Sequence, residues 1–327
     1  MLSADLLRLL SDGQARTGAE LTAATGIASD QLTQALDGLR DAGLSLAETA
    51  DGRIALGRPI EWLDHERVTA AINDSARQHV ERIHCLFEHE STNRFLLEAG
   101  APPRGLTRVA IAEYQHAGRG RRGRRWIMPP GSGIALSAAW QFAQDPKVLS
   151  AFSLATGAVA RRAIHDVTGI EVGLKWPNDL YLDGGKLGGI LVELDPLPGD
   201  TCHVIAGIGI NVDLPEAQRA VVGEQAAGVK DLAGAAAVPD RAELAGALIA
   251  RLVELFTGFE ATGFDAYRDE WSAAHILDGE EVVVHTPART EFGIVRGIEA
   301  DGALIVEDDA GQRLRHTAGD VTVRVNA

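Results

Sequence analysis

Cysteine is almost absent from this sequence. Only Cys85 and Cys202 occur among the 327 residues, and they lie far apart along the chain. A disulfide framework or a thiolate metal site requires more cysteines at closer spacing. We therefore exclude both kinds of site and expect two reduced thiols that pack in the core.

Long hydrophobic runs are also missing. No apolar stretch approaches the roughly 20 residues of a membrane-spanning helix. The N-terminus, MLSADLLRLLSDG, lacks the basic flank and the cleavage site of a signal peptide. We therefore expect a cytoplasmic protein with no membrane partner. A length of 327 residues with 46% hydrophobic composition predicts two or three domains with a substantial core.

Lysine is scarce, and the overall charge is negative. The net charge is −15, and the four lysines are Lys147, Lys175, Lys186 and Lys230. Against this acidic background, residues 118–126 read GRGRRGRRW and carry five arginines. Such a local reversal of sign is suited to binding an anion. Because lysine is so scarce, a lysine within an apolar strand segment is also a candidate for binding an anion.

The first 64 residues show the pattern of a winged helix-turn-helix domain. Apolar periodicity predicts three short helices, the last of which covers SDQLTQALDGLRDAGL. Thr17 and Ser29 are placed to cap the N-termini of the second and third helices. The following LSLAETADGRIAL predicts a β-hairpin that turns at Asp51-Gly52.

Residues 65–274 predict a larger domain, and residues 275–327 a small β-barrel. In the larger domain helical patterns occur at residues 91–98, 147–167, 241–260 and 264–274. They alternate with the strand-like segments RVAIAEY, IALSAAW, VGLKWPNDLYL, GGILVEL and CHVIAGIGINVD. Beyond His275 the pattern is wholly strand-like, with turns between short apolar segments. The predicted fold class is a multidomain α+β protein whose central α/β domain contains a mixed sheet.

The stretch GRGRRGRRW matches G-x-G-x-x-G literally, but its context is wrong for a dinucleotide-binding loop. That fingerprint requires the third glycine to open a helix. Gly123 is instead followed by RRWIMPPGSG, whose prolines and glycines prevent a regular helix. We predict a flexible loop over residues 115–133 that folds as a lid over an anion, with arginines that bind carboxylate or phosphate oxygens. A nucleic-acid-binding arm and a solvated run of charge remain alternatives.

The segment KWPNDLYLDGGKLGGILVEL carries a second group of candidate residues. Trp176-Pro177 predicts an extended, edge-like backbone. Asn178 and Asp179 then place polar side chains in a strand that is otherwise apolar. Buried polar groups need partners, and a binding site supplies them.

Lys186 enters the same segment directly after a glycine-rich turn. A lysine in a buried strand is costly unless an anion pairs with it. Gly188-Gly189 beside it leaves the backbone open for a flat ligand. Alternatively, Lys186 extends to solvent from the edge of a hairpin.

A third cluster lies in HESTNRFLLEAG, where Ser91, Thr92 and Asn93 stand at the predicted start of a helix. Such residues commonly cap helices, and three adjacent hydrogen-bonding side chains can also bind a polar ligand group. His84 and His89 do not share a helical face at ligand spacing. We therefore predict no metal site from protein residues.

Taken in order along the chain, these segments and the domain layout resemble the biotin protein ligases of the bifunctional bacterial type. The segments are STN, EYQHAGRGRRGRRW, KWPNDLYLDGGKLGGILVEL and GIGINV, and the resemblance covers essentially the full length. It implies an enzyme that forms biotinyl-5′-AMP and pyrophosphate from biotin and ATP, with Mg²⁺ bound to the nucleotide. The biotinyl group is then transferred to one lysine of a biotin carboxyl carrier protein domain. The resemblance also implies a homodimer that represses biotin-synthesis genes by binding operator DNA.

The resemblance assigns roles to individual residues. Lys186, Arg121 and Asp179 are the implied catalytic residues: Lys186 contacts the reacting oxygens, Arg121 closes the lid, and Asp179 positions or deprotonates the acceptor lysine. The implied biotin-binding residues are Ser91, Thr92, Asn93, Gln115, Arg119, Gly120, Arg121 and Lys186. The implied lid and nucleotide residues are Gly118, Arg119, Gly120, Arg121, Arg122, Gly123, Arg124, Trp126, Asn178 and Arg324, with Trp126 shielding the adenine.

The charge of the N-terminal segment departs from the pattern of a DNA-binding domain. Residues 1–64 contain five arginines, no lysine and ten acidic residues, a net charge of −5. Neutralisation of phosphates normally supplies much of the affinity for DNA. The expected DNA contacts are Ser29, Gln31, Gln34, Arg40 and Arg53. We predict a weak repressor, with a ligase that retains a vestigial winged helix as the alternative.

Two further functions remain open. A lipoate ligase or octanoyltransferase shares the catalytic fold and also modifies a carrier lysine, although those relatives lack the RGRRGR lid. A transcription factor could instead use the α/β domain only to sense a small molecule. Such a sensor has no need of Lys186, Asn178 and Asp179, so these residues favour turnover.

Overall fold

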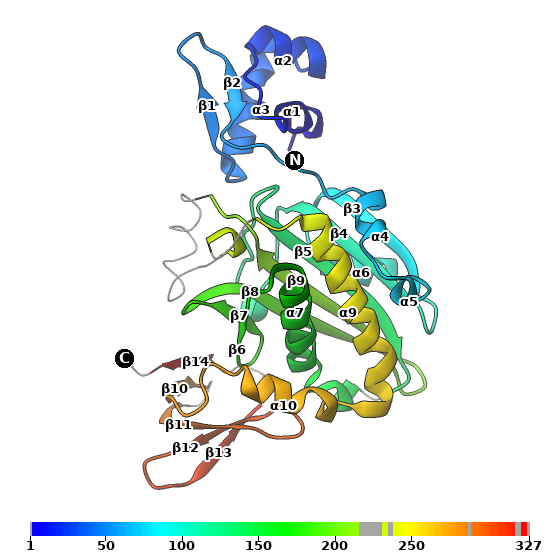
Figure 1. Ribbon diagram of the computed structural model, residues 1–327, viewed down its shortest axis with the longest axis vertical. Coiled ribbons are helices and arrows are strands. Elements are labelled where there is room, and N and C mark those ends of the chain that lie inside the picture. Colours follow the sequence, from blue (N-terminus) through cyan, green and yellow to red (C-terminus); the bar gives the residue numbers. More distant parts are fainter. Residues whose placement is uncertain are drawn as a thin grey trace.

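The protein consists of three units that follow one another along its longest axis (Figure 1). The computed structural model describes residues 2–144, 146–215, 231–234, 238–286, 289–317 and 322–325, the last segment for its backbone and the side chain of Val323. A small helical unit with a hairpin lies at one end, a large sheet covered by helices in the middle, and a small antiparallel sheet at the other end. This arrangement confirms the α+β class.

The N-terminal unit contains the predicted three helices and hairpin, which are α1 (Ala4–Leu10), α2 (Gly18–Thr25), α3 (Ser29–Asp41), β1 (Leu46–Glu48) and β2 (Ile54–Leu56). Their leucines form a core of their own. The predicted cap of α2 is confirmed, because the Thr17 hydroxyl accepts from the Glu20 N–H and the Glu20 carboxylate accepts from the Thr17 N–H. The predicted cap at Ser29 is wrong. The extended backbone continues only to Ala28, so Ser29 is already helical and its side chain does not cap α3.

The central unit is built on a seven-stranded mixed sheet with the order β3-β4-β5-β9-β8-β7-β6. Only β3 and β4 are parallel neighbours, and the other pairs are antiparallel. The strands are β3 (Val80–His89), β4 (Thr107–Gln115), β5 (Gly133–Phe142), β6 (Gly173–Lys175), β7 (Asp179–Leu182), β8 (Gly185–Leu197) and β9 (Thr201–Asn211). The predicted mixed sheet is therefore confirmed.

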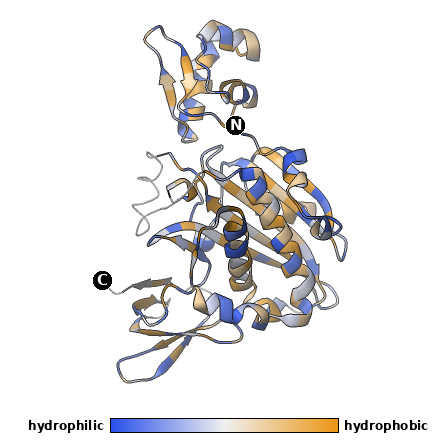
Figure 2. Cartoon of the chain, viewed as in Figure 1, coloured by the Kyte–Doolittle hydropathy of each residue, from blue (hydrophilic) through white to orange (hydrophobic). Residues whose placement is uncertain are grey.

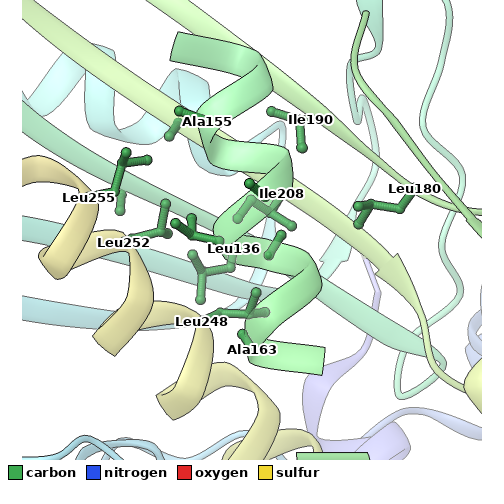
Figure 3. Close-up of a cluster of buried hydrophobic side chains, with 14 of the residues drawn as sticks. Leu136, Ala155, Ala163, Leu180, Ile190, Ile208, Leu248, Leu252 and Leu255 are labelled. Carbon is green, nitrogen blue, oxygen red and sulfur yellow. The ribbon is translucent and has the colours of Figure 1, made fainter. Parts of the chain in front are cut away.

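Helices cover both faces of this sheet. α7 (Phe152–Thr168) and α9 (Arg241–Thr262) pack on one face, and α6 (Thr92–Ala99) packs on the other. Figure 3 shows alanines of α7 and leucines of α9 meeting Leu136, Ile190 and Ile208 of the sheet. The apolar strands appear orange in Figure 2. The shorter elements of this unit are α4 (His65–Ala70), α5 (Asp74–Arg77), η2 (Pro146–Leu149), η3 (Leu232–Gly234) and α10 (Asp265–Ala273).

The predicted continuous strand VGLKWPNDLYL is wrong. A turn with a cis Trp176-Pro177 peptide bond separates β6 from β7, and Lys175 pairs with Asp179 across it. The Asn178 N–H closes the turn on the Lys175 carbonyl at 3.1 Å. Because proline has no N–H for a β-ladder, it favours a chain reversal at this point over a longer strand. The turn brings Asn178 and Asp179 to the edge of the central sheet.

The C-terminal unit is an open antiparallel sheet and not the predicted barrel. Its strands are β10 (Glu281–His285), β11 (Thr290–Ile298), β12 (Leu304–Glu307), β13 (Arg313–His316) and β14 (Thr322–Val325). Their order is β13-β12-β11-β10-β14, so β14 pairs with β10 and not with β13. The two outermost strands therefore remain edges among the strands that the structure describes. The sequence pattern indicated the strands and turns, but closure depends on which strands pair.

The linker between the first two units is held by a buried ion pair. Arg241, at the start of α9, contacts Glu113 of β4 at 2.8 Å, and both side chains are at least nine-tenths buried. The Leu63 N–H donates to the same carboxylate at 2.6 Å, while Arg241 also donates to the Glu61 carbonyl. Arg58 forms an ion pair with Asp213 beyond β9. These contacts attach the linker to the ends of strands in the central sheet.

Both cysteines are free, as the sequence predicts. Cys202 is buried, and burial raises the pKa of the Cys85 thiol to about 11, so this thiol is unreactive at neutral pH. Among the residues that the structure describes, no helix is long and apolar enough to cross a membrane.

Candidate active site

The predicted site residues meet in a cavity on the face of the sheet that carries α6. The cavity lies between the start of α6, strands β5, β8 and β9, and the loop of residues 116–132 that joins β4 to β5. The predicted residues that line it are Ser91, Thr92, Asn93, Gln115, Arg119, Gly120, Arg121, Arg124, Trp126, Asn178 and Lys186. Segments separated by almost a hundred positions in the sequence therefore contribute to one site.

Glycines form the floor of the cavity. Cross-strand register places Gly189 of β8 beside Gly209 of β9, and Gly207 two residues before Gly209 points to the same face. A Cβ atom at Gly207 would overlap the Asn93 side chain, and one at Gly209 would lie 2.5 Å from the Trp126 indole. Larger residues would therefore collide with Asn93 and Trp126, two side chains that line the cavity.

Sequence reasoning found only part of this floor. Gly189 lines the cavity as expected. Gly188 does not line it, because the space next to its Cα atom is occupied by the Gly209 backbone and the Leu180 side chain. Gly207 and Gly209 belong to the segment GIGINV, which contributes to the resemblance, but no site role was predicted for them. Their signal is the spacing of two residues in GIGIN, which places both on one face of a strand.

The loop over residues 116–132 crosses the cavity and is tied down on both sides. At its base the Trp126 N–H donates to the Gly118 carbonyl at 2.9 Å, and within it the Gly120 N–H donates to the Arg124 carbonyl at 2.7 Å. On the far side Arg121 donates to the Asn178 side-chain oxygen at 3.3 Å. The predicted loop is therefore confirmed, with one short 3₁₀ turn, η1 (Arg121–Gly123).

Asn178 connects this loop to β8. Its carbonyl accepts from the Ile190 N–H at 2.9 Å, and its side-chain amide donates to the Ile190 carbonyl at 2.8 Å. Its remaining side-chain oxygen faces Arg121. These bonds to Ile190 fix Asn178 in the position in which its side-chain oxygen accepts from Arg121 of the loop.

Lys186 and Asp179 form an ion pair in the cavity wall. The Lys186 Nζ lies 2.6 Å from the Asp179 Oδ1, and the two side chains are 19% and 17% exposed. The expected anionic partner of the lysine is therefore a carboxylate of the protein. The limited exposure disfavours a lysine that simply extends to solvent. An incoming anion can share the ammonium group with Asp179.

The opposite end of the cavity contains a buried polar cluster. The Ser137 hydroxyl, on β5, lies 2.6 Å from both the Thr92 Oγ1 and the Asn93 Oδ1. The Thr92 N–H donates to the Gln115 Oε1 at 2.7 Å. Ser91 is the N-cap residue of α6, but its side chain forms no capping hydrogen bond. Helix capping by these side chains therefore does not explain the STN segment.

Several predicted residues lie outside the cavity lining. Gly118 supports the base of the loop, and Arg122 and Gly123 are exposed on its outer side. Arg324 belongs to β14, where its backbone pairs with Val283, and its side chain lies outside the described part of the structure. Asp179 reaches the cavity through Lys186.

The predicted DNA contacts lie far from this cavity, on the N-terminal unit (Figure 1). Ser29, Gln31 and Gln34 are exposed on α3. Arg40 pairs with Asp37 at 2.7 Å, and Arg53 pairs with Asp51 at 3.0 Å and with Glu20 at 3.4 Å; all these side chains are substantially exposed. Each predicted cation therefore already has an acidic neighbour.

Across the described residues there is no group of three or more His, Cys, Asp or Glu side chains that could hold a metal ion. The cationic side chains Arg119, Arg121, Arg124, Arg125 and Lys186 instead line the cavity. The site is therefore suited to an anionic ligand with a polar group at its opposite end.

Comparison with known proteins gives consistent matches. The model of the Biotin/lipoate A/B protein ligase family matches residues 89–211, and that of the Biotin protein ligase C terminal domain matches residues 279–324. The chain is 33% identical over 304 residues to the bifunctional ligase/repressor BirA of Salmonella typhimurium, covering 93% of this chain and 92% of that protein. It is also 33% identical over 238 residues to the biotin--[acetyl-CoA-carboxylase] ligase of Paracoccus denitrificans, covering 69% of this chain and 94% of that one.

A solved structure shows the same fold. The biotin protein ligase from Aquifex aeolicus, in complex with biotin and ATP, aligns with a TM-score of 0.62 at 25% identity. The alignment covers 75% of this chain and 100% of that one.

Proposed function

Since the chain belongs to the family of bifunctional biotin protein ligases, we propose that it is a biotin–[biotin carboxyl carrier protein] ligase that forms biotinyl-5′-AMP from biotin and ATP. One observation carries this proposal. Lys186, the loop arginines and the polar cluster around Thr92 line a single cavity, so that one elongated ligand can contact all three. A carboxylate at one end and a polar ring at the other describe biotin.

In the first step the biotin carboxylate attacks the α-phosphorus of ATP, and the bond from this phosphorus to the bridging oxygen breaks, so that pyrophosphate leaves. The attack brings two anions together, and cationic donors aimed at the developing charge stabilise the transition state. Lys186 lies in the wall of the cavity, and Arg119 and Arg121 enter from the loop. We assign Lys186 to the reacting oxygens and the two arginines to the adenylate.

Trp126 provides an apolar surface beside these charges. Its indole packs against Gly209, and no described residue pairs with its buried N–H. We propose that Trp126 shields the adenine and that the closed loop excludes water. Exclusion of water matters because a mixed anhydride hydrolyses.

In the second step the amine of a carrier lysine attacks the carbonyl carbon of the mixed anhydride, which forms an amide bond to the biotinyl group and releases AMP. Asp179 lies 2.6 Å from Lys186, the residue assigned to the reacting oxygens. We propose that it positions the incoming lysine or accepts its proton. Mg²⁺ would bind through the nucleotide phosphates, and we assign it no ligand from the protein.

The alternatives predict different reactions. A lipoate ligase would bind an acyl substrate, which has no polar ring to form hydrogen bonds with the cluster around Thr92. A sensor would bind biotin without catalysing a reaction. Release of pyrophosphate that requires both biotin and ATP supports the ligase. Release with lipoate in place of biotin, or no release at all, contradicts it.

The loop should retain the intermediate, and its arginines offer a matched test. Arg121→Gly removes the contact with Asn178, so we expect adenylate formation to continue and the adenylate to escape about 10-fold faster, the effect of one lost hydrogen bond. Arg122→Gly is the control, because Arg122 is exposed outside the cavity and has a positive φ of 60° that glycine adopts readily. Escape is measured as biotinylation of bystander proteins. Equal retention in both variants contradicts the lid.

We further propose that the protein is a homodimer. β7 pairs with β8 only as far as Gly189, whereas β8 continues to Leu197. Beyond Gly189, no described strand pairs with β8 on the side where β7 lies. This part of β8 is therefore an open edge, and a strand from a second copy of the protein can pair with it. Leu194, on this edge, is 37% exposed. The ordered loop would contribute to the interface after the adenylate binds.

The N-terminal unit is proposed to be a winged helix-turn-helix that binds operator DNA weakly. Arg40 and Arg53 are paired with carboxylates, and the unit as a whole is acidic, so few cations face the phosphates. We therefore expect salt-sensitive binding that occurs only with the adenylate-loaded dimer. A mobility-shift titration at low salt, with biotin, ATP and the DNA upstream of the protein's own biotin genes, measures it. No shift at micromolar dimer contradicts the repressor and leaves the ligase.

A further inference from the structure

The buried polar cluster extends to a residue that sequence reasoning did not single out. Glu193, on β8, accepts from the Asn93 side-chain amide at 2.7 Å. The same amide nitrogen donates to the Leu191 carbonyl at 3.1 Å. A carboxylate and a carbonyl are both acceptors only. The Asn93 Nδ2 must therefore face them, and the Asn93 Oδ1 must face Ser137.

This orientation determines the hydrogens of the next two side chains. Because the Asn93 Oδ1 accepts, Ser137 has to donate its single hydrogen to it at 2.6 Å. The Thr92 Oγ1 lies 2.6 Å from the Ser137 Oγ and 3.2 Å from the Gln115 Oε1. Because Ser137 has no second hydrogen for the shorter of these contacts, Thr92 donates its own hydrogen to Ser137. Ser137 is fully buried and does not line the cavity, so water does not offer it another partner.

The cluster consequently presents a defined pattern to the cavity. With its hydrogen committed to Ser137, Thr92 offers lone pairs and can accept from a ligand N–H. Gln115 accepts the Thr92 N–H through its Oε1, which leaves its amide N–H groups for a ligand carbonyl. An N–H next to a C=O is the pattern of a cyclic urea, the ring group of biotin.

We propose that Glu193 is a specificity-determining positioning residue, which acts through Asn93, Ser137 and Thr92 to make the cavity select a ligand ring with an N–H donor. The inference rests on the proposed function, since it concerns recognition of the biotin ring. Glu193 does not line the cavity, so its effect on the ligand is indirect.

A reversal of the group at position 193 tests this chain of hydrogen bonds. Glu193→Lys replaces one of the two acceptors of the Asn93 amide nitrogen by a donor, while the Leu191 carbonyl remains. The Asn93 amide should therefore turn over in part of the molecules, and in these molecules Thr92 should become a donor. Glu193→Gln retains an acceptor and should behave as wild type. Asp195→Lys is the matched control, because Asp195 follows two positions later on β8 and lies near His203, 3.8 Å away, instead of Asn93.

The measurement compares biotin with cyclic carbamate analogues, in each of which one ureido N–H is replaced by oxygen. We expect Glu193→Lys to raise the KM for biotin about 10-fold with little change in the KM for ATP, and to reduce the preference for biotin over the carbamate facing Thr92 about 10-fold. Ser137→Ala, which interrupts the same relay, should reduce the preference in the same direction and serves if the lysine variant does not fold.

Three outcomes contradict the proposal. The first is that Glu193→Lys and Ser137→Ala both keep the wild-type preference for biotin over the carbamate. The second is that the control Asp195→Lys reduces this preference as much as Glu193→Lys does. The third is that Glu193→Gln loses the preference. Any of these, in a protein that adenylates biotin, overturns the role of Glu193 and leaves the ligase intact. If wild-type protein forms no biotinyl adenylate, the proposed function fails, and this inference fails with it.

Discussion

Lys186→Ala is expected to lower the rate of biotinyl-adenylate formation about 100- to 1,000-fold, the usual effect of removing one donor aimed at the developing charge. The ammonium group lies in the cavity wall next to Asp179, where the carboxylate of the ligand and the phosphate would meet. Pyrophosphate release in the presence of biotin and ATP measures the rate.

The variant should still fold, because the Asp179 side chain is 17% exposed and water can solvate the carboxylate that loses its cation. Lys147→Ala is the control, since Lys147 is an exposed lysine outside the cavity. Lys186→Arg should retain part of the rate because it keeps the charge but not the compact ammonium group. Wild-type turnover by folded Lys186→Ala protein would show that our assignment of the catalytic residue is wrong.

Arg241→Met should reduce the free energy of unfolding by about 3–5 kcal/mol, because it leaves the Glu113 carboxylate buried without its cation. The carboxylate also accepts the Leu63 N–H, so the linker should loosen with it. Urea unfolding followed by circular dichroism measures the loss.

Two comparisons distinguish the effect of an unpaired buried charge on stability from a general effect of any substitution in α9. Arg251→Met, on the same helix, breaks a partly exposed pair with Asp166 and should cost at most about 1 kcal/mol. Glu113→Gln combined with Arg241→Met should recover much of the loss, because no charge is then buried and the Leu63 N–H keeps an acceptor. The explanation is contradicted if Arg241→Met is as stable as wild type. It is also contradicted if the double variant Glu113→Gln/Arg241→Met is less stable than Arg241→Met alone.

Local chemistry was enough to predict the parts of the site that lie within one segment. The glycines and prolines around residues 118–133 predicted a loop between two strands, and the loop is present. Lys186 was expected to have an anionic partner, which is Asp179. Both expectations depend on residues that are close in sequence.

The parts that were missed depend on register between distant strands. Ser137 and Glu193 are an ordinary serine and glutamate in strand sequences, and only the pairing of β5, β9 and β8 brings them to Asn93. The same reason explains the C-terminal sheet, where the strands were predicted but their pairing was not. The turn at Trp176 was missed because an X-Pro step is compatible with both extended and turn backbone.

The most direct test of the central claim is intact-mass spectrometry of a biotin carboxyl carrier protein domain after incubation with the full-length protein, biotin and ATP. We predict that the carrier gains the mass of one biotinyl group, that the gain requires ATP, and that Lys186→Ala nearly abolishes it. A carrier whose mass does not change with active, folded wild-type protein, or one that is modified by lipoate and not by biotin, would contradict the account.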